Sequence, residues 1–426
     1  MLFRRTVRVN DVVSRRMRKH AGLVLGSGTP TSHISILLRN RERPAVVVEP
    51  ARWQRVGGKR VIVDGLLGKV IIDPDPGSLR AYKRTAAWLA AERRGALARR
   101  MEPAVTMDGR RIKICANVSN AEDALRAFAK GADGIGIVRT ELTFMKRKRQ
   151  PSEDAQYSVY RRIVQEAGAA PVVIRTFDLG SDKYPAWAAM TREQNPALGC
   201  RGLRYCLAHP GILRDQVAAV LRAACHGEVW LLLPMVSNVS EVDAVLELVR
   251  RTAAELAAKG TRHKADIPLG AMVEVPCATD IMPALTKRLD FFSIGTNDLI
   301  QYLEAVDREN ERVAPHCDYY HPAVFRAIAQ VTGASSKHVA VCGELAADPV
   351  ALVVLVGLGV TELSMNPSII PSAKRWVRGL SASACTRMAG VLARCYEPTD
   401  RARVLDRVSV MTSNPALQGD ARAKLA

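Results

Sequence analysis

The chain has 426 residues, of which 48% are hydrophobic and 24% charged, and this ordinary composition excludes a disordered or fibrous protein. Its 62 Lys and Arg residues against 42 Asp and Glu residues give a formal net charge of +20. The longest apolar stretch, residues 351–360, is about half as long as a membrane-spanning helix needs to be. No apolar segment follows the basic N-terminus, so we predict neither a membrane span nor a secretory signal.

The basic residues are spread along the chain in short runs such as 15–19 and 146–149. No zinc-finger spacing or aromatic RNA-binding motif accompanies them, so we interpret most of the charge as solvated surface and do not expect nucleic-acid binding. The nine cysteines include no C-x-x-C pair. Scattered cysteines are typical of reduced thiols, which predicts a cytoplasmic protein without a disulfide framework.

In chain order, the first 75 residues contain short apolar runs typical of β-strands, separated by glycine-rich turns. The sequence Asp-Pro-Asp-Pro-Gly at 73–77 is a strong turn signal, and the residues after it favour a helix. We therefore predict a small α/β domain over 1–75 and a helical linker over 76–103. The predicted strands are 23–25, 44–48, 60–63 and 69–72.

Over residues 104–395, apolar runs alternate with Ala- and Leu-rich helical patterns. Continuous apolar strands separated by helices are typical of a parallel sheet, and eight such units predict an α/β fold with a closed (β/α)₈ TIM barrel. The eight runs are 112–117, 134–139, 172–178, 229–236, 269–276, 291–298, 339–344 and 362–367. Residues 396–426 are polar and turn-rich, which predicts a poorly packed C-terminal tail.

Polar side chains gather at the C-terminal ends of the predicted strands, which is the end where a TIM barrel carries its active site. The guanidinium group of an arginine at that end can form paired hydrogen bonds with phosphate or carboxylate oxygens. The opening of the barrel at that end, its mouth, therefore suits a small polyanion. The residues are Arg139, Arg175, Glu274, Asn297, Asp298, Cys342 and Glu344.

Two carboxylates in the same mouth would repel an anion unless a cation lies between them. Glu274 and Asp298 are therefore candidate Mg²⁺ ligands, with structural ion pairs to the arginines as the alternative. A buried cysteine is normally inert. At the end of a barrel strand, however, the Cys342 thiol could donate a proton to a developing carbanion or enolate.

The first region contains a tight loop, Gly-Ser-Gly-Thr-Pro-Thr-Ser at 26–32, which is followed by His33. A histidine at a loop-to-helix junction with hydroxyl residues before it can serve as a nucleophile. By chemistry alone, such a histidine is more often a surface or capping residue. The residues around His33 do not separate these two interpretations.

Ordered motifs along residues 20–380 resemble Enzyme I of the bacterial sugar phosphotransferase system, within the phosphoenolpyruvate (PEP)-utilising enzymes. The segment Thr-Ser-His-Ile-Ser-Ile at 31–36 is similar to their phosphohistidine loop. The other motifs are 134–141, 175–183, 195–201, 272–276, 293–299, 305–308, 341–344 and 362–367. The Asp-Leu-Gly-Ser-Asp-Lys segment at 178–183 is more similar to Enzyme I than to pyruvate phosphate dikinase or phosphoenolpyruvate synthase.

The resemblance implies a Mg²⁺-dependent phosphotransferase in which His33 attacks the phosphorus of PEP and pyruvate is released. It also implies that Cys342 protonates the enolate, and that Glu274 and Asp298 hold Mg²⁺. The implied substrate-binding residues are Arg139, Arg175, Asn297, Asp298 and Arg308, with Arg201 as a supporting contact.

The resemblance implies that residues 1–75 form a truncated swivelling phosphohistidine domain, which docks on the barrel and then turns away. The helical domain that binds the phosphocarrier protein HPr is expected to be absent, because only about 30 residues precede His33. The chain would then be a fragment or a shortened relative, or another element would recruit an HPr-like acceptor. A homodimer through the barrel is also implied. The alternative function is a catalytically idle PEP-binding regulator.

Overall fold

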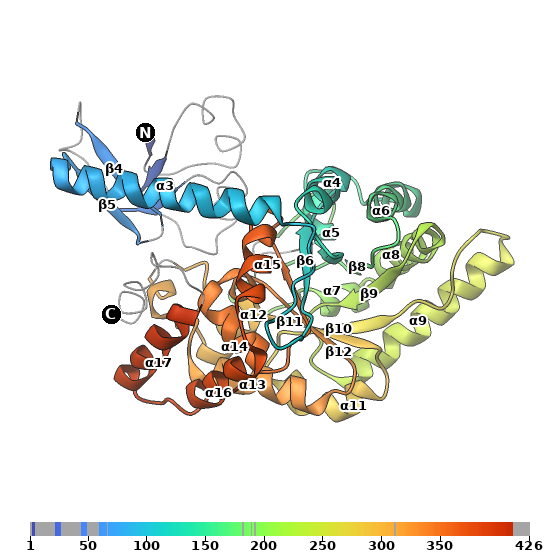
Figure 1. Ribbon diagram of the computed structural model, residues 1–426. Coiled ribbons are helices and arrows are strands. Elements are labelled where there is room, and N and C mark those ends of the chain that lie inside the picture. Colours follow the sequence, from blue (N-terminus) through green and yellow to red (C-terminus); the bar gives the residue numbers. More distant parts are fainter. Residues whose placement is uncertain are drawn as a thin grey trace.

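The computed structural model describes residues 2–4, 22–26, 44–48, 59–65, 67–180, 183–188, 190, 193–310 and 312–411, and for 2–4 the backbone alone. Two parts are joined by one long helix (Figure 1). Among the described helices, none combines the length and apolarity that crossing a bilayer requires.

The N-terminal part consists of two small sheets. Strands β1 (Leu2–Arg4), β2 (Leu23–Leu25) and β3 (Ala45–Val47) form a parallel three-stranded sheet, and β4 (Val61–Asp64) pairs antiparallel with β5 (Lys69–Ile72). The four predicted strands are present. The sequence analysis missed β1, because its three residues are too few to show the alternation of apolar and polar side chains that marks a strand.

Helix α3 (Pro76–Ala98) runs from β5 to the barrel, close to the expected linker. It begins at Asp75, whose carboxylate accepts hydrogen bonds from the backbone N–H groups of Gly77 and Ser78. Ala96 is its single buried residue. The helix is anchored near its end by an ion pair between Glu92 and Arg375 on α15 (Ile370–Arg378).

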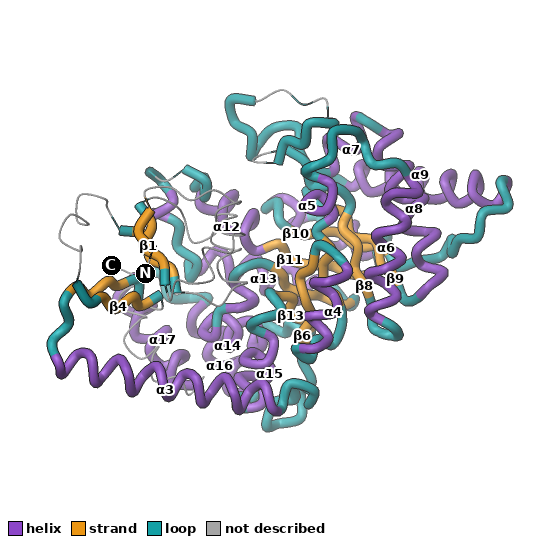
Figure 2. Tube along the Cα trace, turned by 90° about the horizontal axis from the view of Figure 1, so that it is seen from above, coloured by secondary structure: helices purple, strands orange, loops and turns teal. Residues whose placement is uncertain are grey.

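The second part is a closed barrel of eight parallel strands in chain order, as predicted (Figure 2). A parallel strand needs a crossover to return to the same edge, so each strand is followed by one or more helices. The strands are β6 (Lys113–Val118), β7 (Ile135–Val138), β8 (Val172–Arg175), β9 (Val229–Leu233), β10 (Leu269–Val273), β11 (Phe291–Gly295), β12 (His338–Cys342) and β13 (Glu362–Met365).

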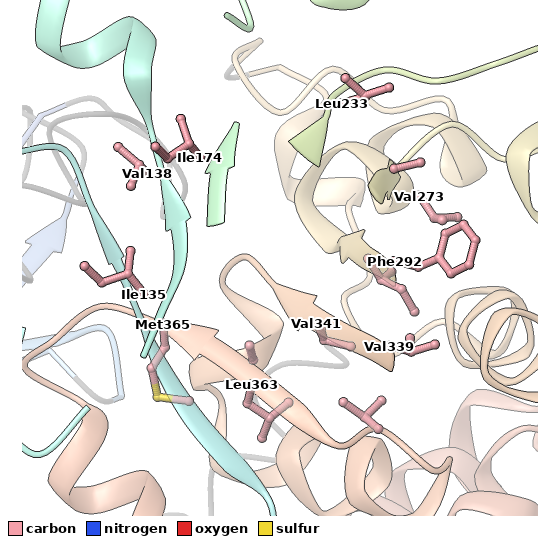
Figure 3. Close-up of a cluster of buried hydrophobic side chains, with 14 of the residues drawn as sticks. Ile135, Val138, Ile174, Leu233, Val273, Phe292, Val339, Val341, Leu363 and Met365 are labelled. Atoms are coloured by element: carbon pink, nitrogen blue, oxygen red, sulfur yellow. The ribbon is translucent and has the colours of Figure 1, made fainter. Parts of the chain in front are cut away.

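Helices cover the outside of the barrel, and the main hydrophobic core lies between them and the strands. In Figure 3, Ile135, Val273, Val341 and Leu363 are four of the strand side chains in this layer. The remaining helices are α4 (Ala121–Ala129), α5 (Thr140–Phe144), α6 (Glu153–Ala167), α7 (Leu203–Ala208), α8 (Pro210–Ala223), α9 (Val239–Ala258), α10 (Cys277–Asp280), α11 (Met282–Thr286), α12 (Thr296–Glu304), α13 (Pro322–Ala334), α14 (Pro349–Gly357), α16 (Ala382–Leu392) and α17 (Pro398–Met411).

The expectation of a poorly packed tail from residue 396 is wrong for its first part, because Pro398–Met411 form helix α17. Val404, Leu405 and Val408 are buried there against the barrel core. Arg401 is also buried, with its guanidinium 2.6 Å from a carboxylate oxygen of Asp318. The segment looked polar because arginine and aspartate alternate with its apolar residues, whereas one of those arginines is buried.

Gly270 on β10 has no room for a side chain, because a Cβ there would lie 2.5 Å from the carbonyl oxygen of Phe291. We predict that Gly270→Ala lowers the free energy of unfolding by about 1–3 kcal/mol, since overpacking forces the strands apart. The matched control is Gly390→Ala, on α16, where a Cβ meets nothing within 4 Å. It should leave stability unchanged or raise it by up to about 1 kcal/mol. Urea denaturation measures both, and equal effects would contradict the prediction.

Glu304 ends α12, and one of its carboxylate oxygens accepts a hydrogen bond from the backbone N–H of Asp318. Burial and the charge of Asp318 raise the pKa of Glu304 from an ordinary value of 4.5 to about 7. Ionisation therefore costs more in the folded protein, and stability should fall as the pH rises from about 4.5 to 7.

We predict that Glu304→Gln removes this loss, because the neutral amide can still accept the Asp318 hydrogen bond. The variant should unfold at a higher urea concentration than the wild type at pH 8, and the difference should shrink at pH 5. A difference that is the same at both pH values would show that the charge of Glu304 is not responsible.

Candidate active site

The polar residues predicted at strand ends lie at the C-terminal edge of the barrel. Arg175 and Cys342 are the last residues of β8 and β12, whereas Arg139 and Glu274 directly follow β7 and β10. Asn297 and Asp298 lie in the first turn of α12, after β11. Parallel strands of a closed barrel end on the same side, so one mouth receives all six side chains.

The Arg139 guanidinium makes no hydrogen bond or ion pair within the described part of the chain, although the charge of Glu141 acts on it. Burial, and next the positive charge of Arg175, lower the pKa of Arg139. Two arginines that repel each other at a barrel mouth are an arrangement that a bound anion would stabilise.

Arg175 is buried and partly paired. Its Nη2 atom donates to Glu141 Oε1 at 2.6 Å and lies 3.3 Å from Asp178 Oδ2. Its Nε atom is buried and has no hydrogen-bond partner among the described residues. A buried donor that is left unpaired is costly, so this guanidinium has capacity for a further acceptor.

Arg201 connects two carboxylates across the mouth. Its Nη2 donates to both oxygens of Asp178, at 3.0 and 3.2 Å, and its Nη1 donates to Asp298 Oδ1 at 2.9 Å. Nη1 also donates to the Tyr302 hydroxyl at 3.2 Å, and that hydroxyl donates to the carbonyl of Ala197. Arg201 is 1% exposed and holds the two acidic residues together, and its buried Nε has no hydrogen-bond partner among the described residues.

Asp178 is a central acceptor that the sequence analysis did not single out. Burial opposes its ionisation, yet Arg201, Lys183 and Arg175 hold its pKa well below the usual range. The Lys183 ammonium group donates to it at 2.8 Å and also lies 3.3 Å from Glu141 Oε1. Asp178 and Glu141 both stand inside the motifs used for the resemblance, but their pairing could not be seen without the fold.

Glu274 and Asp298 are buried carboxylates whose pKa values are shifted in opposite directions. Burial, followed by the charges of Asp298 and Asp178, raises the pKa of Glu274 to about 8. Burial also acts on Asp298, but Arg201 and Arg308 outweigh it and lower the pKa to about 2. Glu274 therefore lies in a place where negative charge is in excess, which fits a cation.

Carboxylate oxygens are the ligands that Mg²⁺ prefers in proteins, and Mg²⁺ commonly keeps water and substrate oxygens in its other positions. The donor set of Glu274 and Asp298 fits that pattern. No cluster of three or more His, Cys, Asp or Glu side chains that could enclose a metal occurs in the described ranges. Any remaining ligands would then come from substrate or water.

Asn297 and Arg308 flank these carboxylates. The Asn297 side-chain oxygen accepts the backbone N–H of Glu344 at 3.0 Å, which leaves its NH₂ group to donate to another partner. Arg308 Nη2 lies 3.7 Å from Asp298 Oδ1, and the Arg308 backbone N–H donates to the side-chain oxygen of Gln301. Both residues lie where a phosphate or carboxylate ligand could be reached from α12 and the loop after it.

Cys342 is buried in the mouth as a thiol. Its Sγ donates to the carbonyl of Ile294 at 3.5 Å and accepts from the Ser293 hydroxyl at 3.5 Å. Burial raises the pKa of the Cys342 thiol, and the Ser293 bond opposes that effect. A group that keeps its proton at neutral pH can act as a general acid. Ser293, which the sequence analysis missed, is the hydroxyl partner of this thiol.

His33 lies outside the described residues, so its position relative to the mouth stays a prediction. The barrel therefore brings together every other predicted site residue, namely Arg139, Arg175, Arg201, Glu274, Asn297, Asp298, Arg308 and Cys342.

We predict that Arg201→Met lowers the free energy of unfolding by about 3–5 kcal/mol, because it leaves Asp178 and Asp298 as buried charges without their shared partner. The control is Arg214→Met, since Arg214 is half-exposed and pairs with Asp215 on the surface. That pair should contribute less than about 1 kcal/mol. Chemical denaturation followed by circular dichroism measures both, and equal losses would contradict the role given to Arg201.

Family comparisons agree with this geometry. Residues 93–382 match the model of the PEP-utilising enzyme PEP-binding domain, and residues 2–68 match that of the PEP-utilising enzyme mobile domain. The chain is 39% identical to a multiphosphoryl transfer protein of Xanthomonas campestris over 90% of this chain and 46% of that protein. Phosphoenolpyruvate-protein phosphotransferases of Staphylococcus epidermidis and Cupriavidus necator are 37% and 36% identical, over 91% and 94% of this chain and 68% and 69% of theirs.

The chain thus spans about half to two thirds of the length of these relatives. Among solved structures, a citrate lyase of Burkholderia xenovorans aligns with 50% of this chain and 72% of its own at 18% identity, with a TM-score of 0.30, which is too weak a likeness to bear on function. The PEP-binding domain model alone covers more than half of the chain, and the protein therefore belongs to the family of PEP-utilising enzymes.

Proposed function

We propose that the protein transfers the phosphoryl group of PEP to His33 and releases pyruvate. The observation that carries this proposal is the Arg139 guanidinium, which lies near Arg175 and has no ion pair or hydrogen bond among the described residues. PEP carries a phosphate and a carboxylate, which are the groups that two arginine forks recognise. The names of the relatives, all of them phosphotransfer proteins, support the same reading.

The barrel residues would act on PEP in three ways. Arg139, Arg175 and Arg308 bind its anionic groups, and the free NH₂ of Asn297 donates to an oxygen of the substrate. The His33 imidazole attacks phosphorus, so a bond between nitrogen and phosphorus forms while the bond from phosphorus to the enol oxygen breaks. The leaving group is the enolate of pyruvate.

Cys342 would complete the reaction. Its S–H bond breaks and the proton goes to the methylene carbon of the enolate, which gives pyruvate and a thiolate that regains a proton from water. Support comes from the burial of the thiol and from its raised pKa, which keep it protonated until a strong base forms beside it.

Glu274 and Asp298 would hold Mg²⁺, which supplies positive charge to the transferring phosphoryl group when it is bound. The support is the buried pair of carboxylates and the raised pKa of Glu274. The charge of Asp298 raises the pKa of Glu274, and a cation between the two carboxylates would relieve this repulsion and attract an anion, so Mg²⁺ and PEP should bind together.

The onward acceptor would be an HPr-like phosphocarrier protein, since phosphotransferases of this name are among the relatives. His33 and the barrel mouth belong to different parts of the chain, so the N-terminal domain has to dock on the barrel and leave it again. Helix α3 and the turn at 73–77 are the connection about which it would turn. Dimerisation through the barrel and a cytoplasmic location stay predictions from the sequence.

We predict that PEP labelled with ³²P, added with Mg²⁺, transfers acid-labile phosphate to the chain with release of one pyruvate per label. His33→Ala should abolish the label because it removes the nucleophile. The control is His263→Ala, since His263 lies before β10, at the end of the barrel opposite the mouth, and should label as the wild type does.

The outcomes separate the alternatives. Labelling of His33→Ala at the wild-type rate would show that another residue is the nucleophile. PEP binding without label or pyruvate would favour the idle regulator instead. Addition of HPr should remove the label from the wild type if an HPr-like protein is the acceptor, and the label should persist if it is not.

A further inference from the structure

A fully buried chain of side-chain hydrogen bonds lies outside the barrel, between α6, α8 and the ends of β7 and β8. We call it the Gln216 network, and its members are Thr140, Gln156, Tyr160 and Gln216. Each of the four is at most 1% exposed. Nothing in the proposed reaction uses these side chains, and their burial has to be explained by the bonds that they make.

The amide of Gln216 has one possible orientation in this network. The backbone N–H of Phe177 can only donate, and it donates to Gln216 Oε1 at 2.9 Å. Gln216 Nε2 therefore supplies both of its hydrogens, to Thr140 Oγ1 at 3.2 Å and to the Tyr160 hydroxyl at 3.1 Å. Thr140 Oγ1 in turn donates to the carbonyl of Arg175 at 2.9 Å.

The far end of the network points away from the mouth. The Tyr160 hydroxyl donates to Gln156 Oε1 at 3.0 Å, and Gln156 Nε2 donates to the carbonyl of Pro151 at 3.1 Å. The two hydrogens of Gln216 Nε2 and the hydroxyl hydrogens of Thr140 and Tyr160 are each used once. Gln156 thus resembles Gln216 in residue type and burial, but it contacts neither of the two strand ends that carry the arginines.

The strand ladder between β7 and β8 is irregular and reaches only to the pair formed by Val138 and Ile174. The register between these strands shifts between Ile135 and Val138. Beyond that point, the backbone N–H of Arg139 bonds to β6, and the backbone N–H of Thr176 bonds to β9. Past the pair of Val138 and Ile174, the connection between the two segments is made by side chains, through the Thr140 bond to Arg175 and the ion pair of Arg175 with Glu141.

This connection has to work against repulsion, because the guanidinium groups of Arg139 and Arg175 are like charges in a buried mouth. If the two segments were free to separate, the arginines would move apart whenever no anion lies between them. A buried amide that binds both segments keeps the cations at one separation before a ligand arrives.

We propose that Gln216 is a positioning residue that holds the segments bearing Arg139 and Arg175 at the spacing required by the anion. The inference rests on the proposed function for one point, which is that the anion is PEP. Gln216 contacts no ligand itself and acts through Thr140 and the backbone of Phe177.

The test compares Gln216→Met with Gln156→Met, because both remove a buried amide of the same size and should lower the urea midpoint to a similar extent. Amide hydrogen exchange is followed in residues 139–141 and 175–178. Gln216→Met should speed exchange there at least about tenfold, while Gln156→Met should leave it near the wild-type rate. Thr140→Val, which cuts the same connection at another atom, should act like Gln216→Met, and Thr140→Ser should restore protection.

The same proteins are assayed with PEP, where Gln216→Met should raise the KM about tenfold with a smaller change in kcat. Equal exchange in both glutamine variants, or unchanged exchange in Gln216→Met, would overturn the inference. A failure of the proposed function would show differently. The wild-type protein would then neither bind PEP nor release pyruvate, while the difference in hydrogen exchange between the two glutamine variants would remain. If Gln216→Met does not fold, the Thr140 pair decides the outcome.

Discussion

The mouth of the barrel depends on one electrostatic constraint: charges that are taken out of water must find opposite charges or bind a ligand. Arg201 satisfies the constraint for two carboxylates, Asp178 and Asp298. Among the described residues, Glu274 and Arg139 satisfy it poorly, because the pKa of the carboxylate is raised and the pKa of the guanidinium is lowered. An excess of negative charge and an excess of positive charge at two strand ends of one barrel mouth describe a site for a cation together with an anion.

Much of the fold could be predicted because the barrel strands are buried on both faces. Such strands are continuous apolar runs, and all eight were visible in the sequence together with the polar residues that end them. Helix α17 could not be predicted from its composition, since the burial of Arg401 depends on Asp318, which is distant in sequence. Strand β1 has only three residues, too few for any periodicity.

The candidate site was predictable to a different degree at each position. Arg139, Arg175, Glu274 and Cys342 follow from a simple rule, because a polar residue at the end of an apolar run points into the mouth of a barrel. The roles of Asp178 and Gln216 depend on side-chain contacts between different strands and helices. A single sequence does not show which distant residues make such contacts. Motif resemblance marked the segment around Asp178, but only the geometry shows that it joins Arg175, Lys183 and Arg201.

Helix α3 has a mechanical consequence. It contains 23 residues of which one is buried, and Glu92 fixes it to the barrel near its end, so it resembles a largely exposed rod. At 1.5 Å per residue, the rod is about 35 Å long. Any rotation about its barrel end carries the β4–β5 sheet along an arc of that radius, so a turn of about 5° becomes a displacement of about 3 Å. The length of the rod, rather than the angle alone, sets how far the N-terminal domain can travel.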